Sequence, residues 1–101
     1  MGYVFVRVWY YTVPESNVGR FLAAYGPEGP WARLFRQARG YEGTELFRGT
    51  DRSDRFITVD TWASEADWQQ FLAEQADAYT ALDVRLEGLA DVERALVEGS
   101  S

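Results

Sequence analysis

Hydrophobic residues alternate with other residues in four stretches of the 101-residue chain, and each alternation predicts a strand. In residues 3–13 valines occupy every second position near the start and mostly aromatic residues lie between them. Further strands are predicted over residues 41–48, 56–62 and 91–98. The last stretch also fits a helix, because residues 93–96 all favour helices.

Apolar residues recur at the helical period between the first two strands. The stripe consists of Val18, Phe21, Leu22 and Tyr25. A glycine- and proline-rich segment at 26–30 ends this helix, and a second short helix begins at Trp31 with Leu34, Phe35 and Ala38 on its inner side.

A second helical region follows the third strand and opens with a capping sequence. The Ser64 hydroxyl is placed to accept a hydrogen bond from the Asp67 amide, while the Asp67 carboxylate reaches back to the Ser64 amide. Trp68 and Phe71 lie on the apolar stripe of this helix. A weak break at residues 76–77 precedes a further stripe that contains Tyr79.

The predicted order of elements is β-α-β-β-α-β, the ferredoxin-like arrangement of the α+β class. Its antiparallel sheet has helices on one face only. We expect the valines of the first strand to pack on the helices. The opposite face of this strand, with Tyr3, Phe5, Trp9 and Tyr11, is too apolar for water. We therefore expect a second copy of the chain to cover these rings, forming a homodimer with a barrel-like core.

Composition and charge narrow the function classes. The length suits a single domain over residues 1–99. The net charge of −6 argues against nucleic acid and against an anionic membrane as partner, and no apolar run reaches spanning length. No signal peptide is visible, so we expect a cytoplasmic protein. The chain has no Cys and no His, which removes thiol chemistry and the commonest metal ligand and general base.

Three segments resemble the antibiotic biosynthesis monooxygenase family. The residues Asp60, Trp62, Ser64, Trp68 and Phe71 follow the spacing of a signature of that family. The runs at 40–46 (GYEGTEL) and 25–35 (YGPEGPWARLF) look like its second strand and one bacterial branch.

The resemblance implies a small dimeric α/β barrel with a pocket between sheet and helices in each subunit. In members of the family this pocket admits a polycyclic phenol and molecular oxygen, and oxidation to the quinone uses no flavin, metal or haem. We therefore expect no cofactor. A related haem-degrading branch relies on a histidine ligand, and this sequence has none.

The resemblance also implicates a tryptophan at the end of the third strand and an asparagine in the first half of the chain. Trp62 matches that tryptophan, and it is also well placed as a core residue that anchors the following helix. Asn17 is the only asparagine, and it equally suits a helix cap. Asp60 shares a strand face with Trp62, where it is either a base for a phenol or the partner of Arg7 or Arg94.

Further candidates for substrate binding are mostly aromatic, and each is either a cavity wall or plain core. They are Phe21, Tyr25, Trp31, Phe35, Tyr79 and the cation Arg7. Three functions remain open: a cofactor-independent monooxygenase that acts on an aromatic, polyketide-like phenol, a polyketide-type cyclase or isomerase, and a non-catalytic domain that binds a small aromatic ligand. Oxygen uptake separates the first from the second, and saturable binding separates both from the third.

Overall fold

Four strands form one antiparallel sheet in the order β2-β3-β1-β4. They are β1 (Phe5–Thr12), β2 (Tyr41–Arg48), β3 (Arg55–Trp62) and β4 (Val92–Ser100). The computed structural model describes residues 4–100. This strand order confirms the predicted ferredoxin-like fold of the α+β class, and it settles the last segment as a strand. The sheet of the single chain stays open and does not close into a barrel.

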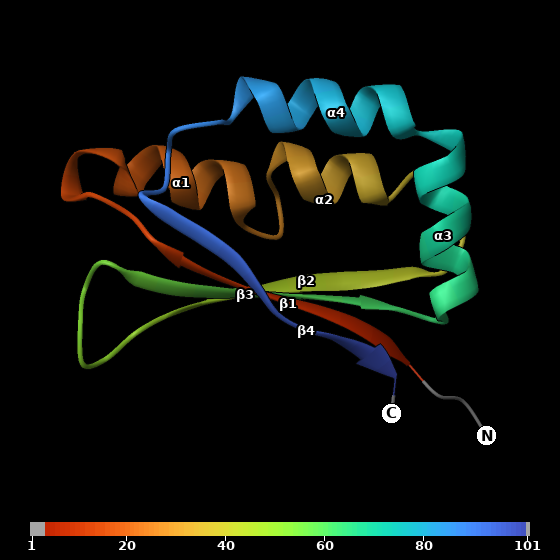
Figure 1. The fold of residues 1–101 in the computed structure, drawn as a ribbon, viewed down its shortest axis with the longest axis horizontal. Coiled ribbons are helices and arrows are strands. Elements are labelled where there is room, and N and C mark those ends of the chain that lie inside the picture. Colours follow the sequence, from red (N-terminus) through yellow and green to blue (C-terminus); the bar gives the residue numbers. More distant parts are fainter. Residues whose placement is uncertain (1–3, 101) are drawn as a thin grey trace.

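The helices cover one face of this sheet. Figure 1 shows α1, α2 and α4 along the same side of the strands and α3 at one end of the sheet. Their bounds are Val18–Tyr25 for α1, Pro30–Phe35 for α2, Glu65–Glu74 for α3 and Ala76–Arg85 for α4. A single 3₁₀ turn, Glu15–Asn17, precedes α1.

Capping fixes where α3 begins. The Asp67 amide donates to the Ser64 hydroxyl oxygen over 3.1 Å, as the sequence predicts. The Asp67 carboxylate accepts from the Ser64 hydroxyl at 3.0 Å, in place of the predicted bond from the Ser64 amide. The cap turns the chain sharply at the end of β3, so that Trp68 and Phe71 are buried against the sheet.

The structure reverses the predicted faces of β1. The rings of Phe5 and Tyr11 are buried at 2% and 4% exposure beneath the helices, whereas Val6 and Val8 lie on the face without helices. Both faces are apolar, and alternation alone does not say which one meets the helices. The larger area of the rings favours their burial in the core. The expectation for Tyr3 lies outside the described residues.

The face of the sheet away from the helices therefore carries mainly aliphatic residues together with Tyr10 and Phe47, and we call it the open face. Phe47 on β2 and Val97 on β4 are 53% and 51% exposed there. Its members follow from strand alternation and register: Val6, Val8, Tyr10, Phe47, Ile57, Val59 and Val97. These residues are contiguous across neighbouring strands, and contiguous apolar patches often mark an interaction surface.

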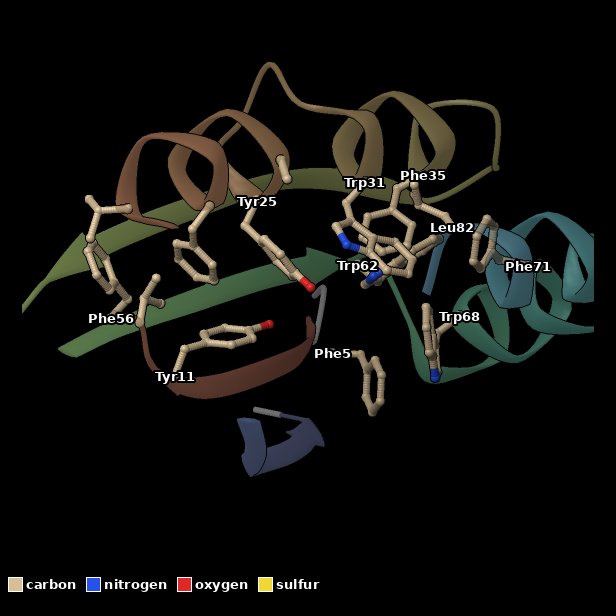
Figure 2. Close-up of a cluster of buried hydrophobic side chains, with 14 residues drawn as sticks. Phe5, Tyr11, Tyr25, Trp31, Phe35, Phe56, Trp62, Trp68, Phe71 and Leu82 are labelled. Carbon is tan, nitrogen blue, oxygen red and sulfur yellow. The ribbon is translucent and has the colours of Figure 1, made fainter. Parts of the chain in front are cut away.

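Aromatic side chains make up most of the core between sheet and helices (Figure 2). In α1, Phe21 stacks on Tyr25 with ring centroids 4.6 Å apart. Leu22 was expected on the same inner stripe, but it is 39% exposed and Ala24 is buried instead. The small alanine lets the rings of the helix approach the sheet.

Gly29 offers a stability test of the link between α1 and α2. A Cβ atom there would lie 2.5 Å from the Ala24 carbonyl oxygen and still closer to that of Ala23. Because both obstacles are backbone, Gly29→Ala is expected to lower the free energy of unfolding by about 1–3 kcal/mol. Urea denaturation measures the change.

The matched control is Gly19→Ala in α1, where no heavy atom lies within 4 Å of the added carbon. This change is expected to raise stability by up to ~1 kcal/mol, since alanine favours helices over glycine. Equal effects of the two variants would contradict the placement of Gly29.

Among residues 4–100, none of the helices has both the length and the apolar character needed to cross a membrane.

Candidate active site

A cavity of about 370 Å³ lies between the sheet and the helices. Its walls are mainly aromatic and come from β1, the two helices before β2, and α4: Trp9, Tyr11, Tyr25, Trp31, Phe35 and Tyr79. A concave site with apolar walls and a few polar groups is the usual form of a small-molecule site. Flat rings on several sides suit a planar ligand.

A row of polar side chains crosses the sheet at one end of the cavity. Asp60 on β3 lies opposite Arg7 on β1 and opposite Thr44 on β2. Glu98 on β4 completes the row as the register partner of Arg7. Thr44, Asp60 and Arg7 line the cavity, so the floor at this end carries a carboxyl group beside a guanidinium group.

Asp60 is buried, at 8% exposure, and held by a short chain of hydrogen bonds. The Thr44 hydroxyl donates to Asp60 Oδ1 at 2.6 Å, and the Tyr41 hydroxyl lies 2.6 Å from the same threonine oxygen. Burial raises the pKa of Asp60 above its ordinary value, although the Thr44 hydrogen bond and the charge of Arg7 oppose this. A carboxyl group in this state is suited to exchange a proton with a ligand.

Arg7 is held by two groups from other elements. Its Nε donates to Glu98 at 3.0 Å, and its guanidinium carbon lies 3.9 Å from the centroid of the Trp68 ring. The side chain is nearly buried, which strengthens a contact of this kind. Arg94, the other predicted partner of Asp60, contacts Tyr10 on the open face, so it is not a partner.

Three tyrosines of the cavity stay protonated at neutral pH. Burial raises the pKa of Tyr11, and the same cause, together with the charge of Glu93, raises that of Tyr25 to about 12. Burial also raises the pKa of Tyr79, with Arg7 acting in the opposite direction. These hydroxyl groups are therefore available as hydrogen-bond donors and not as bases at neutral pH.

The other end of the cavity carries three acidic side chains, which we call the rim acids: Asp83, Glu87 and Glu93. Asp83 comes from α4, Glu87 follows that helix, and Glu93 lies on β4 opposite Tyr11. Partial burial and the charge of Asp83 raise the pKa of Glu93. The two ends of the cavity thus differ in chemistry.

Six of the nine residues predicted for the site line the cavity. They are Arg7, Tyr25, Trp31, Phe35, Asp60 and Tyr79. Phe21, Trp62 and Asn17 do not line it. Trp62 is fully buried behind the wall, with its ring centroid 5.6 Å from that of Phe35. The Asn17 amide donates to the Leu89 carbonyl oxygen at 3.1 Å and accepts from Arg20, which ties α1 to the segment before β4.

Several lining residues were not predicted for the site, and two of them, Trp9 and Tyr11, were assigned to the dimer interface instead. Alternation already places Trp9 and Tyr11 on the same strand face as Arg7, and Thr58 on that of Asp60. That signal was sufficient to find them, had the faces been assigned correctly. The rim acids gave no comparable signal, because their place at the cavity depends on the packing of α4 and the register of β4.

Within residues 4–100 no cluster of three or more acidic side chains is close enough to hold a metal ion.

Comparison with known proteins decides the family. The family model described as antibiotic biosynthesis monooxygenase matches residues 4–82, more than half of the chain. The chain belongs to the antibiotic biosynthesis monooxygenase family. Among curated proteins, no sequence matches this member of the family.

Solved structures share the fold of this family member at low sequence identity. SnoaB, a cofactor-independent oxygenase from Streptomyces nogalater, is 17% identical with a TM-score of 0.61, and the match covers 96% of this chain and 93% of SnoaB. A Nitrosomonas europaea protein, provisionally titled an antibiotic biosynthesis monooxygenase, is 14% identical with a TM-score of 0.70, over 98% and 91% of the two chains.

A longer neighbour comes from Lactobacillus acidophilus and is provisionally titled a monooxygenase. It is 11% identical with a TM-score of 0.73, and the match covers 98% of this chain but 45% of the neighbour. All of these likenesses show the fold alone. The family is monooxygenase-like, and the substrate of this chain does not follow from it.

Proposed function

We propose that the cavity is the active site of a cofactor-independent monooxygenase that oxidises a polycyclic phenol with molecular oxygen. One observation carries the proposal: a buried carboxyl group, Asp60, and a buried cation, Arg7, face the same aromatic cavity. The phenol of a planar substrate lies at this end, with its rings between the aromatic walls. The family and the cofactor-independent neighbour SnoaB support this direction.

The first step is removal of the phenol proton. The Asp60 carboxylate accepts it, and the positive charge of Arg7 stabilises the phenolate that remains. Thr44 holds Asp60 in position through its 2.6 Å hydrogen bond. The aromatic walls favour this transfer because Asp60 and Arg7 are buried and so have little contact with bulk water.

Oxygen then reacts with the substrate itself. The phenolate passes one electron to oxygen, and the two radicals join to form a carbon–oxygen bond at a ring carbon that carries hydrogen. Loss of that hydrogen as a proton and cleavage of the O–O bond give the quinone carbonyl and one water. One oxygen atom enters the product and the other enters water, so the electrons balance. The residues of the cavity hold, deprotonate and desolvate the substrate.

The test uses 1,8-dihydroxyanthrone, a three-ring phenol that oxygen converts to a quinone. We expect the protein to accelerate oxygen consumption above the buffer rate, with about one oxygen consumed per quinone formed. Labelled oxygen should appear in the product carbonyl. A rate equal to that of buffer or of heat-denatured protein would overturn the proposal for this class of substrate.

A second candidate is acid–base catalysis by a cyclase or isomerase. The chain of hydrogen bonds from Tyr41 through Thr44 to Asp60 favours it, because it can pass a proton without oxygen. Turnover of a polyketide-like substrate under nitrogen would select this candidate. Saturable binding of an aromatic ligand without any turnover would indicate the third function, a non-catalytic ligand-binding domain.

We also propose that two copies pair through the open face. Its apolar side chains lie on neighbouring strands and no helix covers them. The neighbour from Lactobacillus acidophilus has length for a second domain of this size, which would satisfy the same need within one chain. Phe5, Trp9 and Tyr11 take no part, because they lie on the face of β1 that the helices cover.

Val8→Asp tests this pairing, since Val8 lies at the centre of the open face between Val59 and Val97. The wild type is expected to sediment at twice the 11.5 kDa chain mass. The variant should raise the dissociation constant by at least about tenfold, because the interface would bury an unpaired charge. Leu22→Asp on α1 is the control and should leave the dimer intact. A wild-type protein that is still monomeric at a chain concentration of about 100 µM would contradict the pairing.

A further inference from the structure

The ionisable groups of the cavity are unequal in number and sign. Arg7 is the one cation among the described lining residues, and it is already paired with Glu98. Against it stand Asp60 and the three rim acids. Within residues 4–100 no arginine lies at ion-pair distance from any rim acid. The cavity therefore has a net negative charge, with its unpaired part at the rim.

The two charged ends lie a defined distance apart on the sheet. Asp60 is the register partner of Arg7, and Glu93 is the register partner of Tyr11. Arg7 and Tyr11 are four residues apart on β1, which corresponds to roughly 13 Å at about 3.3 Å per residue. A ligand that reaches both ends is elongated, of the size of three fused rings with a substituent at each end.

Aromatic rings lie between the two ends and close to the rim. The Tyr25 and Trp31 ring centroids are 6.3 Å apart, and those of Trp31 and Tyr79 are 5.1 Å apart. The faces of such rings attract organic cations, most strongly where carboxylates stand nearby. Glu93 also feels the charge of Asp83, an unfavourable contact that a cation between the two would relieve.

Trp31 adds a hydrogen-bond donor to the cavity wall. Its residue is 9% exposed, and its indole nitrogen makes no hydrogen bond of normal geometry in the described part of the chain, as is also true of the Trp62 indole nitrogen in the core. A weaker contact from Trp31 acts on the Tyr25 hydroxyl and lowers the pKa of Tyr25, against the larger effect of burial. Figure 2 shows that nitrogen on the side of the ring that faces Tyr25, which is also a cavity wall. Buried N–H groups are rarely left unpaired. A ligand oxygen on the same ring system would satisfy this donor.

We propose that the substrate is a planar phenol that carries a protonated amine, held at the rim between Asp83 and Glu93 with its phenol at Asp60. The inference rests on the proposed function for the role of the cavity, and it adds the charge and length of the substrate. An organic cation suits the rim better than a divalent metal, because no described group of three acidic side chains converges closely enough to bind one.

The test compares three probes with one ring system: 2-(aminomethyl)anthracene, 2-(hydroxymethyl)anthracene and anthracene-2-carboxylate. Fluorescence titration at low salt measures the affinity of each probe. The ammonium probe should bind roughly fivefold to twentyfold more tightly than the neutral alcohol, and the carboxylate more weakly than both. Salt should reduce the ammonium advantage.

A double variant, Asp83→Asn with Glu93→Gln, removes the rim charge and keeps the shape of both side chains. The ammonium probe should then bind within threefold of the alcohol. The matched control, Asp77→Asn with Glu42→Gln, removes the same charge from positions that do not line the cavity, and it should keep the ammonium preference.

The outcomes separate this inference from the proposed function. Equal affinity of the ammonium and alcohol probes, or an unchanged preference in the double variant, would overturn the amine while the aromatic site stands. Loss of the preference in the control variant would assign it to overall charge and also overturn the amine. If none of the three probes binds, both the amine and the aromatic substrate site fall. If anthrone oxidation fails while the ammonium preference holds, the proposed oxidation falls and the amine site remains.

Discussion

The Asp60→Asn variant is expected to lower the rate of oxygen-dependent turnover by about 10²–10⁴-fold. It should unfold no more easily than the wild type. Asparagine keeps the oxygen that accepts from Thr44 but cannot take the phenol proton. A catalytic carboxyl kept away from water costs stability, so its removal should not weaken the fold. Initial rates and thermal unfolding of the same preparation measure both effects.

The pH dependence of the wild type follows from the raised pKa of Asp60. Turnover should rise with pH as the carboxyl loses its proton, with a midpoint above the ordinary value of about 4. The folded state binds the Asp60 proton more tightly than the unfolded chain does. The protonated carboxyl therefore makes its full contribution to the free energy of unfolding below about pH 4. This contribution is lost as pH rises through the raised value.

Asp54→Asn is the matched control outside the cavity. A hydrogen bond from Arg52 lowers the pKa of this exposed carboxyl, so its contribution is present at neutral pH and is lost as pH falls. The variant should keep full turnover. Asp60→Asn with normal turnover would remove Asp60 from the mechanism, whatever its stability.

Trp62→Ala is expected to lower the free energy of unfolding by about 3–5 kcal/mol, a large part of the 5–15 kcal/mol typical of a domain. Trp62 is fully buried, and its ring meets those of Tyr41, Trp68 and Phe71 at centroid distances of 5.3–5.4 Å. Deletion of the indole would leave a large hole that these rings cannot fill. Denaturant unfolding measures the loss.

Trp62→Phe separates support of the fold from contact with a ligand. It should cost about 1–3 kcal/mol of stability and leave probe affinity nearly unchanged, because Trp62 lies behind the cavity wall. Trp68→Leu should instead lower turnover roughly tenfold, since it removes the ring that holds the Arg7 guanidinium. If Trp62→Phe weakened probe affinity as much as Trp68→Leu lowers turnover, Trp62 would have to contact the ligand directly.

The order of elements could be predicted because each has a local signature. The Ser64 cap and the stripe with Trp68 and Phe71 are encoded within a few residues of one another. The faces of β1 could not be predicted, because Val6 and Val8 are as suited to a core as Phe5 and Tyr11. What decides is the packing of rings from α1 and α2, which no strand pattern contains.

The candidate site could be predicted where strand neighbours suffice. Asp60 and Arg7 fall opposite each other once β1 and β3 are paired, and both line the cavity. Trp62 follows the same alternation yet lies behind Phe35, because the short helix α2 places a ring between it and the cavity. Whether a side chain lines the cavity or lies behind another ring depends on packing from a distant segment of the chain. The alternation of residues along a strand does not contain this information.

The family match ends at Leu82, and every rim acid comes after it in the chain. The cavity residues at the Asp60 and Arg7 end come from β1, β2 and β3, with Glu98 of β4 holding Arg7, while the rim acids come from the end of α4, the residues after it and the start of β4. We expect changes at the rim acids to alter which ligand binds without disturbing Asp60 and Arg7. Grafting residues 83–93 from one relative onto another should then change ligand choice and leave Glu98, which holds Arg7, in place.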